Sequence, residues 1–259
     1  MSAPVSVPDR LIVTASPHLR PADSTPRIMW NVVYSLVPVL AASAWFFGIS
    51  ALLVCAAATL GAVRAERAFG RRGTLGDGSA AITGLLLGLT LPAGMPLWMV
   101  FVGGAFAIAF GKAVWGGLGQ NVFNPALVGR AFLQGAFPVA ITTWPTEGGG
   151  FWALRGDLFA APFTHPTMNA VTSATPLGLL KFEGKGTALS HLVLGNTGGS
   201  VGETAALIIL ACGAYLAIRD YLNWRIPVSI MLSVAVLSGI IHAIDPHKPD
   251  ALFMLFSGG

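Results

Sequence analysis

Residues 28–63 read IMWNVVYSLVPVLAASAWFFGISALLVCAAATLGAV, and this stretch decides the class of fold. A hydrocarbon core about 30 Å thick is crossed by about 20 residues of helix, so the stretch is too long for one span. Gly48 follows a run of three aromatic residues and is the natural place for a turn. The stretch therefore predicts two membrane helices, at 28–46 and 49–66.

The composition of the whole chain supports an integral membrane protein. Hydrophobic residues make up 54% of it and charged residues 10%, and the mean hydropathy is +0.71. A soluble domain carries about 25% charged residues. The net charge of +4 does not indicate nucleic-acid binding, because the basic residues cluster at the ends of apolar runs, where they report topology.

The basic residues predict which ends of the first hairpin face the cytoplasm. Arg27 precedes its first helix, and Arg64 and Arg67 lie at the end of its second. Arginine at both open ends places both on the cytoplasmic side. Residues 1–27 are polar and proline-rich, with no cleavable signal peptide, and are expected to form a cytoplasmic N-terminal tail.

The rest of the chain alternates apolar helices with polar breaks. Residues 79–91 are apolar for only about 13 residues, which suits a half-helix or re-entrant element. Residues 28–142 are read as membrane helices with a glycine-rich break at 115–121. The segment 143–200 is expected to be an extracytoplasmic loop, periplasmic in a Gram-negative cell. Residues 201–259 are read as further membrane helices, cut short within a new element. Beyond the half-helix, helices are expected at 96–114, 124–142, 201–218 and 226–244.

Thr175 stands in the most informative polar segment, MNAVTSATPL, residues 168–177. Pro176 disfavours a helical conformation for the residue before it, so Thr175 should be extended and reachable. Thr175 can be a helix N-cap with proline at the first helical position. An anionic group on its hydroxyl would face the free N–H groups at a helix start. The alternative is an ordinary helix cap in a loop.

Four ordered blocks resemble the RnfD/NqrB family, membrane subunits of ion-pumping electron-transport complexes, and lean towards the Rnf branch. The resemblance implies an all-α multi-pass bundle with broken or half helices. It also implies a transporter-like inverted-repeat scaffold whose second repeat is incomplete here. The blocks are DGSAAITGLLLGLTLP (77–92), WGGLGQNVFNPALVGRAF (115–132), SATPLG (173–178) and GNTGGSVGE (195–203).

The resemblance implies two flavins. In the family, the threonine of an S-A-T sequence carries FMN through a phosphoester, which corresponds here to Thr175 beside Ser173 and Ala174. A flavin transferase would attach it, although Asn169 stands where that enzyme usually meets an aspartate. A second, non-covalent flavin, riboflavin, is expected near Gly116 and Gly117. The alternative for these glycines is tight helix packing.

Polar groups around the break at 115–121 are further candidates for flavin or ion contacts. Asn124 has a structural role as an N-cap before a proline. Asn121 has no such role and is the better candidate for a flavin or ion contact. Trp115 could stack on a flavin, although packing is the simpler interpretation. Arg130 lies one turn into an apolar helix and could pair with a flavin, an acid or helix-end carbonyls.

Three other ionisable groups have both structural and functional interpretations. Glu203 follows Ser200 in capping-box spacing, and the alternative is an ion ligand. Asp77 is a cap or lines an ion path, and Lys112 near a helix end is expected to snorkel to the interface. Cys55 and Cys212 are read as buried hydrophobic residues, and no metal site is expected.

We therefore expect a flavin-carrying subunit that relays electrons coupled to sodium or proton transport, and that is not catalytic alone. With no nicotinamide fingerprint and no iron–sulfur cysteines, it would depend on the other subunits of an Rnf-type complex in the cell inner membrane. The alternative is a solute channel or secondary transporter without a redox cofactor, for which broken helices are also typical. A purely structural membrane anchor is a third possibility.

Overall fold

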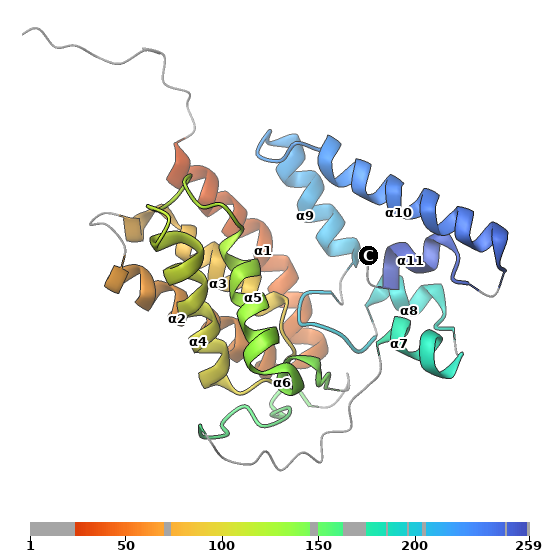
Figure 1. Ribbon diagram of the computed structural model, residues 1–259, viewed down its shortest axis with the longest axis horizontal. Coiled ribbons are helices and arrows are strands. Elements are labelled where there is room, and N and C mark those ends of the chain that lie inside the picture. Colours follow the sequence, from red (N-terminus) through yellow and green to blue (C-terminus); the bar gives the residue numbers. More distant parts are fainter. Residues whose placement is uncertain are drawn as a thin grey trace, which may run out of the picture.

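The computed structural model describes residues 24–69, 74–145, 150–162, 175–184, 186–195, 197–203, 206–246 and 248–257. Its first two helices, α1 (Thr25–Phe47) and α2 (Ile49–Phe69), form the predicted hairpin (Figure 1). They meet at Gly48, whose φ of +67° only glycine adopts readily. Together with α10, these are three described helices long and apolar enough to cross a membrane. The expectation of a helical membrane protein is confirmed.

The remaining described elements are a 3₁₀-helical turn, Thr74–Asp77, and helices of which only α10, with 20 residues, is long. A π-helical turn, Ala109–Ala113, continues α4, and another, Leu179–Glu183, continues α7. The helices are α3 (Ser79–Leu89), α4 (Leu97–Ile108), α5 (Pro125–Ala136), α6 (Pro138–Thr142), α7 (Pro176–Gly178), α8 (Leu189–Leu194), α9 (Ala206–Ile218), α10 (Arg225–Ile244) and α11 (Ala251–Ser257).

Two predicted helices differ from those observed. The helix expected at 124–142 is interrupted at Phe137, whose φ of −134° and ψ of +57° are not helical. The cause is Pro138, which restricts the residue before it and has no N–H to continue the ladder. The helix expected from residue 201 is described only from Ala206, and residues 201–203 form a turn.

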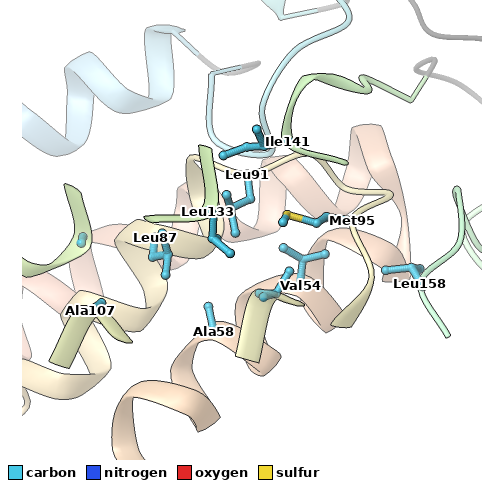
Figure 2. Packing of buried hydrophobic residues seen from close by; sticks show 11 residues of the cluster. Val54, Ala58, Leu87, Leu91, Met95, Ala107, Leu133, Ile141 and Leu158 are labelled. Carbon is cyan, nitrogen blue, oxygen red and sulfur yellow. The ribbon is translucent and has the colours of Figure 1, made fainter. Parts of the chain in front are cut away.

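The core lies among α2, α3, α4 and α5, where α2 packs against α3 and α4, and α5 packs against α4 and α3 (Figure 2). Val54 of α2, Leu87 of α3 and Leu133 of α5 are each fully buried there. Met95 and Leu158 close the cluster from the connecting segments. The short helix α3, of 11 residues, is thus packed among α2, α4 and α5, in agreement with the short element predicted for residues 79–91.

Glycines let the backbones of these helices touch directly. A β-carbon on Gly104 of α4 would clash with the Ala58 carbonyl of α2, and one on Gly61 would clash with the Phe101 carbonyl of α4. A β-carbon on Gly84 of α3 would likewise clash with the backbone of Thr59 in α2. In a bilayer, where apolar burial does not drive helices together, such close approach supplies the packing energy.

A loop from the second half of the chain docks onto the end of α3. Val201 N donates to Leu91 O at 3.0 Å and Gly202 N to Leu89 O at 2.7 Å. Ser43 Oγ of α1 donates to Val201 O at 2.6 Å. This loop connects the bundle of α1–α6 to the group of α7–α11, whose α9 also contacts α1.

The segment after α6 fastens the α1–α2 turn. Arg155 Nε donates to Phe47 O at 2.8 Å and its guanidinium lies over the Phe47 ring. Ile49 N donates to Phe151 O at 2.9 Å. This segment lies at the bottom of Figure 1, and the start of α1 and the α9–α10 turn lie towards the top. The start of α1 and the α9–α10 turn therefore lie at one end of the structure, and the segment after α6 lies at the other.

Gly104→Ala should destabilise the bundle by about 1–3 kcal/mol, because its β-carbon meets backbone that cannot rotate away. Thermal unfolding in detergent measures the loss. Gly135→Ala is the matched control, since the space beside Gly135 on α5 is open and alanine is the better helix former. Equal unfolding temperatures for Gly104→Ala and the unmutated chain would contradict this account of the packing.

Candidate functional site

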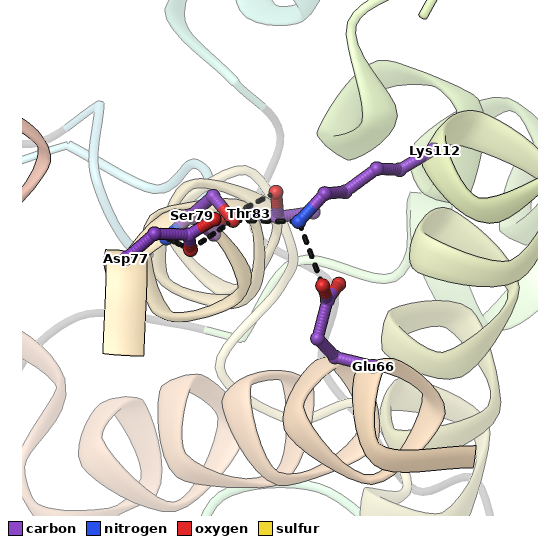
Figure 3. Close-up of polar contacts among 5 residues, drawn as sticks. All are labelled: Glu66, Asp77, Ser79, Thr83 and Lys112. Atoms are coloured by element: carbon purple, nitrogen blue, oxygen red, sulfur yellow. Dashed lines mark hydrogen bonds and ion pairs between the residues drawn. The ribbon is translucent and has the colours of Figure 1, made fainter. Parts of the chain in front are cut away.

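A buried ion pair joins the π-helical turn to α2. Lys112 Nζ lies 2.9 Å from Glu66 Oε1, and the two side chains are 3% and 2% exposed. Lys112 Nζ also donates to Ser79 Oγ of α3 at 2.7 Å. Figure 3 shows the lysine reaching from one helix towards α2 and α3 together. The prediction that Lys112 snorkels to the interface is wrong, because its partners lie inside the bundle.

Ser79 extends this contact into a short chain of polar groups. Its N–H and its hydroxyl donate to Asp77 Oδ1 at 2.8 and 2.6 Å. Thr83 Oγ1 donates to Ser79 O at 2.9 Å, one turn further along α3 (Figure 3). Asp77 therefore satisfies a free N–H in the first turn of α3, as the cap interpretation predicted, and at the same time touches the buried cluster.

The position of this cluster makes it a candidate functional site. Ionisable side chains among membrane helices are costly, and they mark ion paths and proton relays. A single π-helical turn inside a helix is also frequent at functional sites. Sequence reasoning missed Glu66, because Arg64 and Arg67 beside it made this stretch look like a solvated helix end. The available signal was a single acid, preceded by Ala65 and followed by Arg67, near the end of a largely apolar helix.

A cavity of about 350 Å³ opens beside the ion pair. Lys112, Ser79 and Thr83 line one side of it, and Asn121 and Asn124 line another. The structure therefore brings Leu118 and Asn121 of the glycine-rich break together with Ser79 and Thr83 of α3, which lie far from the break in the sequence. Apolar side chains complete the lining: Met29, Ile82, Leu86, Leu118, Val122, Phe123 and Pro125.

The glycines of the break are required by backbone conformation. Gly116, Gly117 and Gly119 have φ values of +105°, +110° and +86°, a region that side chains disfavour. A β-carbon on Gly117 would meet nothing within 4 Å, so the tight-packing alternative is wrong for this residue. Trp115 is 45% exposed, and its indole N–H donates to Phe110 O at 2.8 Å.

The other residues proposed for this region have structural partners. Asn124 Oδ1 accepts from Ala126 N at 2.9 Å, which confirms the N-cap. Asn121 Nδ2 donates to Phe123 O at 2.9 Å. Arg130 Nη1 donates to Thr90 O at 2.9 Å, just after α3. Arg130 was expected to pair with a flavin, an acid or a helix-end carbonyl, and its hydrogen bond in the structure is to a helix-end carbonyl.

Thr175 has the local geometry that its neighbours predicted. Its φ of −62° and ψ of +154° are extended, Pro176 opens α7, and Gly178 N donates to Thr175 Oγ1 at 3.2 Å. The N-cap is confirmed, and the residue is half-buried. Ser173, Ala174 and Asn169 lie outside the described residues.

Thr175 lines a second cavity, of about 540 Å³. Most of its walls are apolar, from α9, α10 and α11, including Ile209, Leu210, Ile230, Met231, Leu255 and Phe256. Thr197, Glu203 and Ser257 contribute polar groups. Ser257 Oγ is buried and has no hydrogen-bond partner among the described residues. Glu203 is the one ionisable residue in the described lining.

Only one of the two hydrogen bonds of the predicted capping box at Ser200 and Glu203 is present in the described residues. Ser200 N donates to Glu203 Oε2 at 3.3 Å. Ser200 Oγ is buried without a partner in the described part of the chain, so it does not return the bond. Cys55 is buried against α3 as expected, whereas Cys212 is only partly buried.

These features define a polytopic helical membrane protein with a buried ion pair and a broken helix. The chain belongs to the NQR2, RnfD, RnfE family, whose match covers residues 12–259. The RnfD/NqrB resemblance is thereby confirmed.

Its relatives include components of ion-translocating complexes. The chain is 38% identical to the D subunit of the proton-translocating ferredoxin:NAD(+) oxidoreductase complex of Clostridium ljungdahlii, over 95% of this chain and 74% of the relative. It is 37% identical to the D subunit of the Na(+)-translocating ferredoxin:NAD(+) oxidoreductase complex of Acetobacterium woodii, over 96% and 73%. It is 38% identical to the D subunit of the ion-translocating oxidoreductase complex of Stutzerimonas stutzeri, over 91% and 73%. The expectation of an oxidoreductase subunit agrees with these relatives.

Lys112→Met should destabilise the protein by about 3–5 kcal/mol, because it leaves the Glu66 carboxylate buried without its cation. Adding Glu66→Leu should recover most of this loss. The test is thermal unfolding in detergent of Lys112→Met, of Glu66→Leu and of the double variant. Lys181→Met, at an exposed lysine, is the control. A double variant as unstable as Lys112→Met would rule out the pair as the cause.

Proposed function

We propose that this chain is the flavin-carrying membrane subunit of an ion-translocating electron-transport complex, with FMN linked through phosphate to Thr175. One observation carries the proposal: the Thr175 hydroxyl stands at the wall of a large, mostly apolar cavity in a member of this family. The relatives' names supply the coupling of electron transfer to ion movement.

The residues around the second cavity fit a flavin. Its volume of about 540 Å³ lies within the range of small-molecule pockets, which are apolar with a few polar groups. Ser257 Oγ lacks a partner among the described residues and is available for a polar ring atom. Gly178 N, which now bonds Thr175 Oγ1, could bond a phosphate oxygen instead. When bound, the flavin supplies reversible electron uptake, and the protein holds and tunes it.

The first cavity is our candidate for the second flavin, riboflavin. Gly116 and Gly117 do not line this cavity, but the next residue, Leu118, does. The space beside Gly117 is open, so a flat ring could approach its backbone closely. Asn121, Asn124 and Lys112 line the cavity with donors and acceptors. Arg130 braces the end of α3 through Thr90 O, and we assign it a supporting role.

The buried pair of Lys112 and Glu66 is our candidate for the place where the transported ion is handled. One relative is named for protons and another for sodium, so both ions remain in the proposal. The chain has two cysteines, too few for a four-cysteine iron–sulfur cluster. Electrons would therefore pass between this flavin and partner subunits of the complex. We place the N-terminus in the cytoplasm, the Thr175 loop in the periplasm and the chain in the inner membrane.

Thr175→Ala should remove the covalent flavin and abolish coupled electron transfer, because alanine has no oxygen to esterify. The readout is fluorescence of the protein band on a denaturing gel, with the mass of the tryptic peptide that contains residue 175. The chain is expressed in its native complex with its own flavin transferase.

Thr197→Ala is the matched control, because it removes a hydroxyl from the same cavity and leaves Thr175 intact. It should keep the flavin mass. A wild-type peptide that weighs only its amino acids would overturn the proposal. Colourless protein that moves a solute by itself would favour the channel instead. Unchanged complex activity in Thr175→Ala would favour a structural anchor.

A further inference from the structure

We propose that Glu203 is the fixed negative charge that lowers the reduction potential of the flavin in the Thr175 cavity. This inference rests on the proposed function. It assigns Glu203 a role beyond the helix cap that its spacing with Ser200 suggests. The chemical partner is the electron-accepting ring of the flavin, which becomes more electron-rich when it is reduced.

The backbone holds Glu203 firmly at the cavity wall. The preceding residue, Gly202, donates to Leu89 O at 2.7 Å. A β-carbon on Gly202 would lie 2.9 Å from the Leu89 β-carbon, so the loop is pressed against α3. Glu203 therefore follows a residue that is fixed to α3, and its side chain lines the space that Thr175 also lines.

The surroundings of the Glu203 carboxylate strengthen its electrostatic effect on a flavin bound in the cavity. It is the one ionisable group in the described lining, and the walls on α9, α10 and α11 are apolar except for Ser257. The charged or titratable residues on the elements around it stay out of the lining. They include Lys181 and Glu183 after α7, His191 in α8, Arg225 and His242 in α10, and Asp250 before α11. No cation lining the cavity therefore offsets Glu203 within the described residues.

The sign of the effect follows from electrostatics. A negative charge opposes the arrival of an electron, so it favours the oxidised ring and lowers the potential. Glu203 is exposed when the cavity is open, but a ligand that fills the cavity excludes water from the side that lines it. Repulsion between charges grows as water is removed, because the effective dielectric constant falls.

The cap does not require this charge. Its one bond runs from Ser200 N to Glu203 Oε2 at 3.3 Å, and glutamine serves this position as well as glutamate. Glu203→Gln therefore keeps the acceptor oxygen and the side-chain length, and removes only the charge. The substitution separates the two roles.

The test is a spectroelectrochemical titration of the Thr175-linked flavin in the intact complex, with and without Glu203→Gln. We expect the variant to shift the equilibrium constant for one-electron reduction about tenfold towards the reduced form, which is about 59 mV upward. Glu203→Asp keeps the charge and should keep the wild-type potential. Glu183→Gln removes the same charge outside the cavity lining and should change the constant less than twofold.

Equal potentials in the wild type and in Glu203→Gln, with the flavin mass present in both, would overturn the inference and leave Glu203 a cap. A shift of the same size in Glu183→Gln would also overturn it, because the effect would not belong to the cavity. Absence of flavin mass on the wild-type peptide would instead overturn the proposed function, and this inference with it.

Discussion

The direct contact of α2 with α3 and α4 through glycine is the constraint on which the rest of the structure depends. Gly61, Gly84 and Gly104 leave no room for a β-carbon between these backbones. Because the helices lie so close, Ser79 at the start of α3 comes within hydrogen-bonding distance of Lys112, which also reaches Glu66 on α2. Wider spacing would leave both charges buried and unpaired, which is strongly destabilising.

The short helix α3 connects the two cavities. Its first turn carries Ser79 into the buried polar cluster, and Ser79 and Thr83 line the smaller cavity. Beyond its other end, Leu89 and Leu91 hold the loop that places Glu203 in the wall of the Thr175 cavity. With 11 residues, α3 is about 16 Å long at 1.5 Å per residue. The helix α3 therefore lines the smaller cavity directly and contacts the Thr175 cavity only through the loop that carries Glu203.

Local signals in the sequence were sufficient for much of the fold. Gly48 after an aromatic run marked the hairpin, and Asn124 before Pro125 marked the cap of α5, because turns and caps depend on adjacent residues. The break at Phe137 was missed although Pro138 signalled it. The spacing of Gly84 and Gly88 on α3 also signalled close helix contact. No local signal indicated that Lys112 and Glu66 form a pair, because the two residues lie 46 positions apart in the sequence.

The sequence by itself determined that this chain is a helical membrane protein, where its main helices run, and that Thr175 is an extended cap. Apolar length, proline and capping residues act over a few neighbouring positions, so they can be interpreted without the fold. Only the tertiary structure decided that Lys112 is buried against Glu66, that Arg130 binds a carbonyl, and that Thr175 and Glu203 share a cavity. These outcomes depend on which helices pack together, because the free energy of a buried charge or polar group is set by partners that the folded chain brings from distant positions.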